Sequence, residues 1–368
     1  MENPKSILDE VLSSQDEQLL QNFDPLASVM ALLKSVDSRG ADVIVKRYSL
    51  DGKPVRTLEE IGQSYQVTRE RVRQIESATI AELQEKQAHL EDMVRVILSI
   101  LQMYGKVMEE SQLLDALLAE REKREADRNA TLFVLDLSDH FKAFPETADT
   151  HKSWGTTDAS LEVPKKLVDA FVEILNNQKQ PIPHEQVAAH LVKHPVYQQH
   201  AQVLPESALT SHLAMSKKVR RNPFNEWGLT HWSQIAPKGV KDKAFVVLHK
   251  AGKPLHFVEI AKRIDDTGFD RKKAHPQTVH NELIKDKRFV LVGRGIYALG
   301  EWGYQPGTVA DVLEKILRQA GKPLDRDSLI AQVEKQRLVK KNTILLGLQN
   351  KARFLKLPDG RYSVVDKK

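Results

Sequence analysis

The stretch VTRERVRQIESATIAEL, residues 67–83, decides the fold of the N-terminal part of this chain. Apolar or small side chains recur in it every three or four residues, at Val72, Ile75, Thr79 and Leu83. This period predicts a helix with one buried face, and Thr68 just before it is a favourable N-cap. Charged and amide side chains crowd the first turns of the same helix, on the face opposite to the buried one.

The preceding stretch, RTLEEIGQSYQ at residues 56–66, predicts a second, shorter helix. Thr57 and Glu60 have the spacing of a capping box, which places the helix start at Leu58. We expect Gly62 where the two helices approach closely. Two short helices joined by a tight turn are typical of a helix-turn-helix, whose second helix enters the major groove of DNA by its N-terminal end.

The residue types at that N-terminal end suit the edges of bases. Arginine binds guanine through two hydrogen bonds, glutamine pairs with adenine, and glutamate accepts from cytosine N4. The side chains available for these contacts are Arg69, Glu70, Arg73 and Gln74. A solvated helix face is the ordinary alternative for a run of charges. Here the caps, the turn, the glycine and the charge pattern agree, which favours DNA recognition.

Residues 51–85, which include DGKPVRTLEEIG and VTRERVRQIE, resemble region 4.2 of bacterial primary sigma factors, and residues 26–50 resemble region 4.1. The resemblance implies binding to the −35 promoter element and docking on the flap of the RNA polymerase β subunit. It further implies two sets of DNA contacts: base reading by Arg69, Glu70 and Gln74, and phosphate contacts by Thr57, Arg71 and Arg73. No aromatic-rich strand-opening region is found, so we expect no promoter opening by this chain alone.

A second pattern fills the rest of the chain and occurs four times. VLHKAGKPLHFVEIAKRI at residues 247–264 recurs as ILRQAGKPLDRDSLIAQV at residues 316–333, with fainter copies at residues 174–191 and 100–117. Each copy continues into a further helix and a pair of short strands, as in RFVLVGRGIYAL at residues 288–299. A helix, a helix-turn-helix and a hairpin in this order predict a winged helix.

The third copy, residues 240–304, resembles the HARE-HTH family, which includes the N-terminal domain of the RNA polymerase delta subunit and modules of restriction enzymes. We therefore expect a mainly α protein: a sigma region 4 helix-turn-helix followed by four tandem winged-helix units, each with a small β-hairpin wing. The expected boundaries are 1–25 for an N-terminal tail with a short helix, 26–88 for the region 4 module, and 89–160, 161–236, 237–305 and 306–368 for the first to fourth winged-helix units.

Charge favours the third unit as a second DNA contact. Residues 238–295 hold 14 Lys and Arg against 7 Asp and Glu, an excess of +7 that is larger than the +5 of the whole chain. Lys272, Lys273, His275, Gln277 and His280 are expected on its recognition helix, and Arg294 at its wing tip. Among these we expect Lys272, Lys273 and Arg294 to meet phosphates, because phosphate contacts need charge but no base-reading geometry.

The second and fourth units carry weaker signals. Lys217, Lys218, Arg220 and Arg221 of the second unit fit a phosphate backbone and a solvated wing equally well. The third helix of the fourth unit contains TILLGL, residues 343–348, and is apolar on several sides. That composition favours packing or a protein partner over DNA.

Enzyme chemistry finds little support in the sequence. Cysteine is absent, which excludes disulfides and thiolate sites, and no phosphate-binding loop or nucleophile elbow occurs. Five histidines gather in the second unit, at His184, His190, His194, His200 and His212, without the glutamate of a zinc-protease motif. Asp136, Asp139 and Lys142 loosely resemble a nuclease constellation but fall at an expected recognition helix. We expect no catalysis, no cofactor and no metal.

The predicted function is therefore sequence-specific DNA binding in transcription initiation or its regulation. The expected partners are double-stranded DNA with a −35-like element and the RNA polymerase core. No apolar run is long enough for a membrane span, and we expect a cytoplasmic, nucleoid-associated protein. Two alternatives stay open: a delta-like polymerase accessory subunit whose winged helices bind protein, and the DNA-specificity module of a DNA-processing system.

Overall fold

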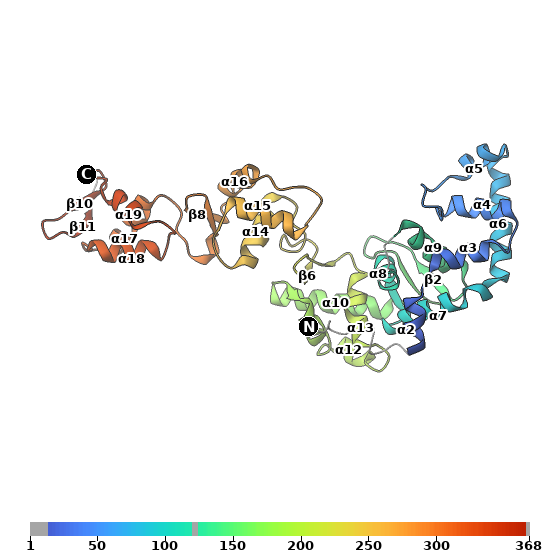
Figure 1. Cartoon of the computed structure of the whole chain (residues 1–368). Coiled ribbons are helices and arrows are strands. Elements are labelled where there is room, and N and C mark those ends of the chain that lie inside the picture. The colour runs from blue at the N-terminus through green and yellow to red at the C-terminus, as the bar shows by residue number, and fades with distance from the viewer. Residues whose placement is uncertain (1–13, 120–123, 366–368) are drawn as a thin grey trace. The chain divides into compact units, whose positions relative to one another are not determined.

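The structure is a computed structural model that describes residues 14–119 and 124–365 (Figure 1). The described residues fall into two compact bodies. The first body runs to Arg220 and includes Trp227–Thr230, and the second contains Arg221–Glu226 and the residues from His231 onward. Helices dominate both, and the strands form small antiparallel sheets, which confirms the expected mainly α class. Within the described residues no helix is long and apolar enough to cross a membrane.

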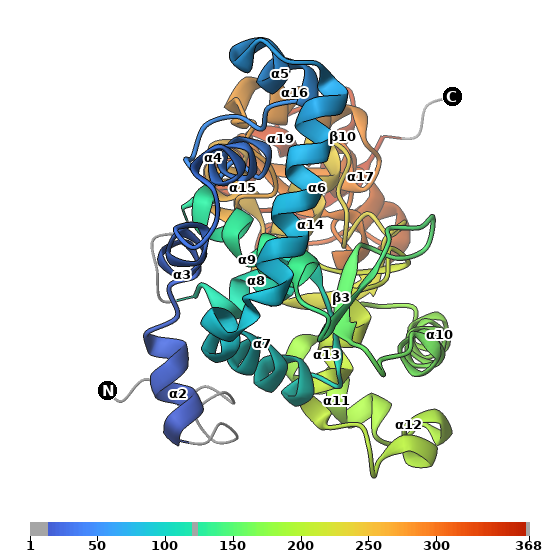
Figure 2. The ribbon, with the colours of Figure 1, turned by 90° about the vertical axis from the view of Figure 1, so that its right-hand side faces the viewer.

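The first body begins with the helices of the region 4 module. They are α2 (Ser14–Gln21), α3 (Pro25–Leu33), α4 (Ser38–Arg47), α5 (Leu58–Tyr65) and α6 (Arg69–Glu85). The expected capping box is present, since Thr57 and Glu60 bond reciprocally at the start of α5, and Thr68 caps α6. A Cβ on Gly62 would lie 2.7 Å from the Val67 carbonyl oxygen, so glycine is needed where α5 meets the turn. Figure 2 shows α6 running from α5 past α4 to α7.

Two winged-helix units follow. After η1 (Gln87–Leu90), the first contains α7 (Glu91–Met103), β1 (Val107–Glu109), α8 (Glu110–Leu117), α9 (Glu125–Leu137), β2 (Phe141–Phe144) and β3 (Ser153–Thr156). The second contains α10 (Glu162–Gln178), β4 (Ile182–Pro183), α11 (His184–Leu191), α12 (Pro195–His200), α13 (Glu206–Ala214), β5 (Val219–Arg221) and β6 (Glu226–Leu229). The helix that precedes the wing is α9 in the first unit and α13 in the second.

The third and fourth winged-helix units belong to the second body. The third contains α14 (Val240–Ala251), β7 (Leu255–His256), α15 (Phe257–Thr267), α16 (Pro276–Lys285), β8 (Phe289–Gly293), β9 (Ile296–Leu299) and η2 (Gly300–Trp302). The fourth contains α17 (Val309–Ala320), α18 (Arg326–Glu334), α19 (Lys341–Leu348), β10 (Phe354–Lys356) and β11 (Tyr362–Val364). The turns at Gly293–Gly295 and Pro358–Gly360 lie between paired strands, as the sequence predicts.

Sequence reasoning missed one short strand in each of the first three units. β1, β4 and β7 follow the first helix and pair with the wing, giving sheets in the orders β1-β3-β2, β4-β6-β5 and β7-β9-β8. In the fourth unit an isolated bridge between Leu324 and Tyr362 takes this place. Strands of two or three residues are too short to show an alternating pattern, so the sequence carried no signal for them.

The region 4 module and the first winged-helix unit share one hydrophobic core. Leu32, Ile44 and Leu83 of the module belong to the same buried cluster as Phe133 and Val134 of α9. α9 packs along α3, and the Phe133 ring meets the Tyr48 ring edge-on at 4.7 Å between centroids. The helix-turn-helix also has a small core of its own, made by Val43, Ile61 and Val72.

The second winged-helix unit is joined to the first through α13. The Ser207 hydroxyl donates to the Met103 carbonyl oxygen at 2.6 Å, and the Ser211 hydroxyl donates to Gln112 Oε1 at 3.0 Å. Gly105 has a φ of 80°, and a Cβ there would lie 2.8 Å from the Ala208 methyl group. Neither α9 nor α13 is therefore an open surface helix.

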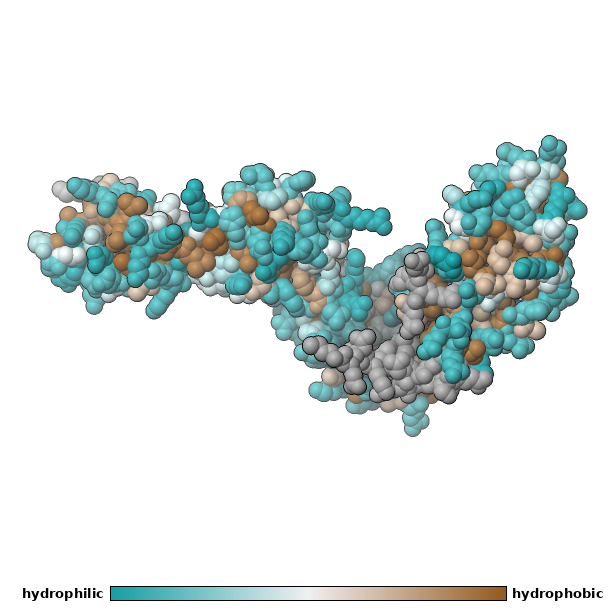
Figure 3. Space-filling model, viewed as in Figure 1, coloured by the Kyte–Doolittle hydropathy of each residue, from teal (hydrophilic) through white to brown (hydrophobic). Residues whose placement is uncertain are grey.

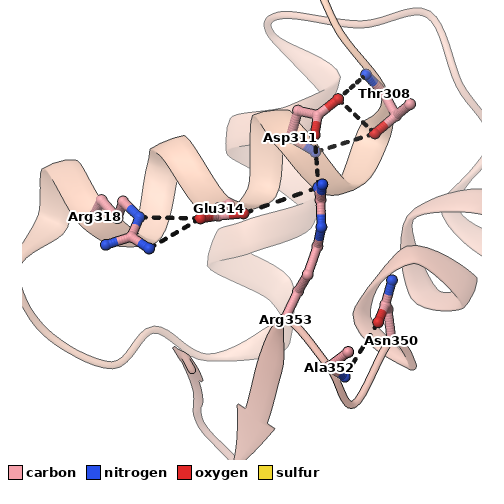
Figure 4. A network of polar contacts seen from close by, with 7 residues as sticks. All are labelled: Thr308, Asp311, Glu314, Arg318, Asn350, Ala352 and Arg353. Carbon is pink, nitrogen blue, oxygen red and sulfur yellow. Dashed lines mark hydrogen bonds and ion pairs between the residues drawn. The ribbon is translucent and has the colours of Figure 1, made fainter. Parts of the chain in front are cut away.

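In the second body each winged-helix unit has its own core. The fourth unit is tied together by a polar network at the start of α17 (Figure 4). Asp311 accepts hydrogen bonds from the backbone and hydroxyl of Thr308, and Arg353 Nη1 lies 2.6 Å from Asp311 Oδ1. Glu314 binds Arg318 on the next turn of α17. The network connects the first turn of α17 to the residue that precedes β10.

Candidate nucleic-acid interface

The N-terminal half of α6 presents the predicted side chains on one exposed surface. Val72 is fully buried beneath it, and Thr79 and Leu83 continue the buried face, whereas Ile75 is half-buried. The exposed set comprises Arg69, Glu70, Arg71, Arg73 and Gln74. The period of the sequence therefore predicted the orientation of this helix correctly.

Four of these five side chains are joined in two pairs one helical turn apart. Arg73 donates through Nε and Nη2 to the two carboxylate oxygens of Glu70, at 3.0 and 2.7 Å. Hydrogen bonding by Arg73 lowers the pKa of Glu70, so this glutamate is an acceptor. Arg71 Nη1 donates to Gln74 Oε1 at 3.1 Å. Arg69 makes no ion pair within the described part of the chain, which leaves its guanidinium available to a base.

Thr57 is the predicted phosphate contact on α5, and its hydroxyl is already engaged. Thr57 Oγ1 lies 2.8 Å from Glu60 Oε2, and the Thr57 backbone N–H donates to the same oxygen at 2.7 Å. These hydrogen bonds lower the pKa of Glu60. A phosphate at this helix start would compete with a carboxylate that already satisfies its donors.

A cluster of polar and aromatic side chains connects α4 to α5, the first helix of the helix-turn-helix. The sequence analysis did not predict this cluster. The Tyr65 hydroxyl donates to the Asp42 carboxylate, which also binds Lys46. The Arg39 guanidinium carbon lies 5.0 Å from the centre of the Tyr65 ring. Asp42 and Lys46 are four residues apart on a helix, a spacing that signals an ion pair in the sequence. The contribution of Tyr65 depends on the fold.

In the third winged-helix unit the structure corrects three predicted positions. Lys272 and Lys273 precede α16 instead of lying on it, and His275 is its N-cap with an extended backbone, because Pro276 occupies the first helical position and disfavours helical geometry at the residue before it. Both lysines are exposed and make no ion pair among the described residues, and the same holds for Arg294 at the wing tip. His280 packs on Phe257 at 4.6 Å between ring centroids, which turns its ring toward the body of the unit.

The first two winged-helix units offer less to DNA. The helices α9 and α13 are largely enclosed by protein. The buried side chains of α9 include Phe133, Val134 and Leu137, and those of α13 include Ala208, Leu209 and His212. In the second unit Lys217 pairs with Glu146 at 2.5 Å and Lys218 with Asp169 at 3.0 Å, whereas Arg220 and Arg221 stay exposed.

The remaining candidates do not assemble into a site. Asp136 lies on α9, but Asp139 lies beyond its end, and Lys142 sits over the Phe144 ring on β2. Among the five histidines, His184 stacks on Trp227 and His212 is buried, with a pKa lowered by burial to about 4. Over residues 14–119 and 124–365, no group of three or more metal-ligating side chains is present.

Comparisons with known proteins match two segments of the chain. Residues 32–85 match the family model "Sigma-70, region 4", and residues 239–302 match the HARE-HTH model, a "restriction endonuclease HTH domain" that is also named after ASXL proteins. The sigma factor SigA of Nostoc sp. is 50% identical over 52 residues, which are 14% of this chain and 13% of that protein. The principal sigma factor HrdD of Streptomyces viridifaciens is 36% identical over 90 residues, 21% of this chain and 27% of that protein.

This chain thus spans only a small part of the length of the sigma factors it matches. Both matched families are DNA-binding domains and not enzyme families, and they support a DNA-binding, sigma-like role related to transcription. The helix-turn-helix and the third winged-helix unit, described above from their own geometry, are the two matched segments. The chain therefore carries a sigma-70 region 4 domain at residues 32–85 and a HARE-HTH domain at residues 239–302.

Proposed function

We propose that this protein is a transcription factor that binds a −35-like promoter element through α6. The observation that carries the proposal is the exposed set at the N-terminal end of α6. Arg69 is free for a guanine, and Glu70 and Gln74 are held in fixed orientations by Arg73 and Arg71. In this proposal Arg69, Glu70 and Gln74 read bases, while Arg71 and Arg73 contact phosphates. Thr57 contacts a phosphate in competition with Glu60.

The proposed protein partner is the RNA polymerase core, through the flap of its β subunit. An apolar patch lies over α3 (Figure 3). Met30, which belongs to this helix, keeps 39% of its surface exposed. α3 packs against α9 and η1, whereas α5 packs on the N-terminal half of α6 through Ile61 and Val72. DNA binding by the N-terminal end of α6 would therefore leave this patch open. Contiguous apolar surface of this kind suits a protein partner better than a phosphate backbone.

We further propose that the third winged-helix unit adds a sequence-independent contact through Lys272, Lys273 and Arg294. The six segments bounded at residues 25, 88, 160, 236 and 305 are the corresponding proposed domains. This arrangement separates two tasks: α6 selects the site, and the third unit contributes charge.

Binding-site selection from a random duplex library tests the role of α6. Arg69→Ala and Gln74→Ala should each cost about 1–3 kcal/mol on the preferred duplex and relax the preference at one base position. Arg326→Ala is the matched control, because Arg326 is exposed on α18 and pairs only with its neighbour Asp327. If both α6 variants select the same sequence logo as the wild type, the base-reading assignment fails.

A polymerase accessory subunit is the second candidate, and one observation favours it. α9 and α13 both pack against protein within this chain, so winged helices here do make protein contacts. Capture of the core polymerase combined with genome-wide DNA occupancy separates the two functions. Polymerase binding without any preferred DNA sequence would support the accessory subunit, and occupancy centred on promoter −35 elements would support the factor proposed above.

A further inference from the structure

The wing of the third winged-helix unit is in direct backbone contact with the fourth. The Leu338 N–H donates to the Val292 carbonyl oxygen at 2.9 Å, and Arg337 Nη1 donates to the Leu291 carbonyl oxygen at 2.6 Å. A Cβ on Gly293 would lie 2.7 Å from the Leu338 carbonyl oxygen. The strand β8 and the segment before α19 therefore form a joint that leaves no room for a side chain at position 293.

Arg337 has a positional role in this joint. Its side chain is buried, with only 5% of the residue exposed, and its Nε and Nη2 have no hydrogen-bond partner. A guanidinium buried without a hydrogen-bonded carboxylate is unfavourable, and each unsatisfied buried donor costs more than one hydrogen bond contributes. The contact that Arg337 does make is to the third unit, so its burial fixes residues 337 and 338 against the wing.

The joint brings basic residues of two units together. Arg294 follows Gly293 at the wing tip, while Lys340 and Lys341 follow Leu338 and begin α19. Because the chain advances at most about 3.6 Å per residue, the Cα atoms of Arg294 and Lys340 are no more than roughly 15 Å apart. All three side chains are exposed, and none makes an ion pair with another described residue.

We propose that Arg294, Lys340 and Lys341 form one phosphate-binding strip for duplex DNA across this joint. A solvated face is the ordinary role of two neighbouring lysines, but these stand at the N-terminal end of a third helix and beside a wing tip. B-DNA carries one charge per roughly 1.7 Å of its axis, so a strip of this length faces several phosphates. The fourth unit then binds DNA by the start of α19, although the rest of that helix is apolar. The inference rests on the proposed DNA-binding function.

The first test measures the affinity of the full chain for a random-sequence duplex at several salt concentrations. The double variant Lys340→Ala/Lys341→Ala should flatten the slope of log K against log salt by roughly 0.9 per lost contact, up to about 2. Lys322→Ala/Lys351→Ala is the control, because it removes the same charge from the same unit at sites outside the joint. Equal slopes for the two double variants, or no change with either, would overturn the strip.

The second test opens the joint without removing charge. Gly293→Ala places a methyl group against the Leu338 backbone, whereas its nearest contact inside the wing is the flexible Ile296 side chain at 3.3 Å. Hydrogen exchange at the Leu338 amide should accelerate, and the salt slope should flatten as in the lysine variant. Adding Lys340→Ala/Lys341→Ala to Gly293→Ala should then have little further effect. If the joint opens and the lysines keep their full contribution, the strip is not shared between the units.

Failure of the strip differs from failure of the proposed function. If the wild-type chain binds duplexes and selects a sequence, but its salt slope is unaffected by the lysine variants, only the strip is wrong. If the wild-type chain binds no duplex, the proposed function is wrong and the strip falls with it.

Discussion

Phe133→Ala should destabilise the region 4 module even though Phe133 belongs to the first winged-helix unit. Phe133 is 1% exposed on α9, inside the core that α9 shares with α3, α4 and α6. Its ring meets Tyr48, the residue that ends α4, edge-on at 4.7 Å. Removing a buried phenylalanine ring costs about 3–5 kcal/mol, which includes the loss of the aromatic pair.

Hydrogen exchange followed by mass spectrometry locates this loss along the chain. At about 1.4 kcal/mol per factor of ten, the amides of α4 that exchange through opening of the shared core should exchange roughly two to three and a half orders of magnitude faster. Phe133→Ala removes no DNA contact directly. The affinity for the preferred duplex should therefore fall only because part of the population has an opened module. The fourth winged-helix unit, which has a separate core, should exchange at its normal rate.

Phe171→Ala is the matched control. Phe171 is also fully buried and packs edge-on against an aromatic ring, that of Trp227, but it lies on α10 in the second winged-helix unit. It should accelerate exchange in α10 and leave α4 at the wild-type rate. If Phe133→Ala accelerates exchange in α9 alone, the shared core is not one cooperative unit, and the helix-turn-helix folds independently of the winged helix behind it.

Three further outcomes are expected. Changing Lys272, Lys273 and Arg294 together to alanine should flatten the salt slope of DNA binding by up to about 3 and weaken all duplexes alike, with the base preference intact; an unaltered slope would place the third unit off the DNA. Burial lowers the pKa of His212 to about 4 from its ordinary 6.5, so the unfolded state binds more protons than the folded state between these pH values. The first body should therefore lose up to ~3 kcal/mol of its free energy of unfolding as pH falls from 6.5 to 4. Calorimetry on His212→Leu should show a free energy of unfolding that depends less on pH. Hydrogen bonding by Arg353 and then Thr308 lowers the pKa of Asp311 to about 2 from 3.8. The ionised Asp311 therefore stabilises the fourth unit fully above pH 3.8, and this stabilisation is lost as pH falls through about 2. Arg353→Met should weaken this acid sensitivity, and an acid unfolding curve identical to that of the wild type would contradict the role of the network.

The features that the sequence predicted correctly are those set by neighbours in the chain. The capping box at Thr57, the cap at Thr68 and the buried face of α6 depend on residues within a few positions of each other. The prediction that Lys272, Lys273 and His275 lie on the recognition helix was wrong, although Pro276, which sets the helix start, is a local signal.

The packing of α9 and α13 was not predicted, because their partners are distant in the sequence. Phe133 meets Tyr48, and Ser207 meets Met103, through contacts that only the fold brings together. The joint at Gly293 and Leu338 is of the same kind. A weak signal did exist in α9, whose segment ATLFVLDL at residues 130–137 is apolar on more sides than a groove-reading helix needs.

The burial of α9 and α13 bears on how repeated domains diverge. Once a third helix is enclosed by its neighbour, selection acts on its volume and shape and no longer on its charge. Ala130 and Phe133 of α9, and Ala208 of α13, stand on enclosed surfaces, whereas Gln277 of α16 faces solvent. Units of similar fold can thus serve as spacers or as DNA-binding units according to a few outward-facing positions. The composition of those positions is a guide to which repeats of such an array have kept contact with DNA.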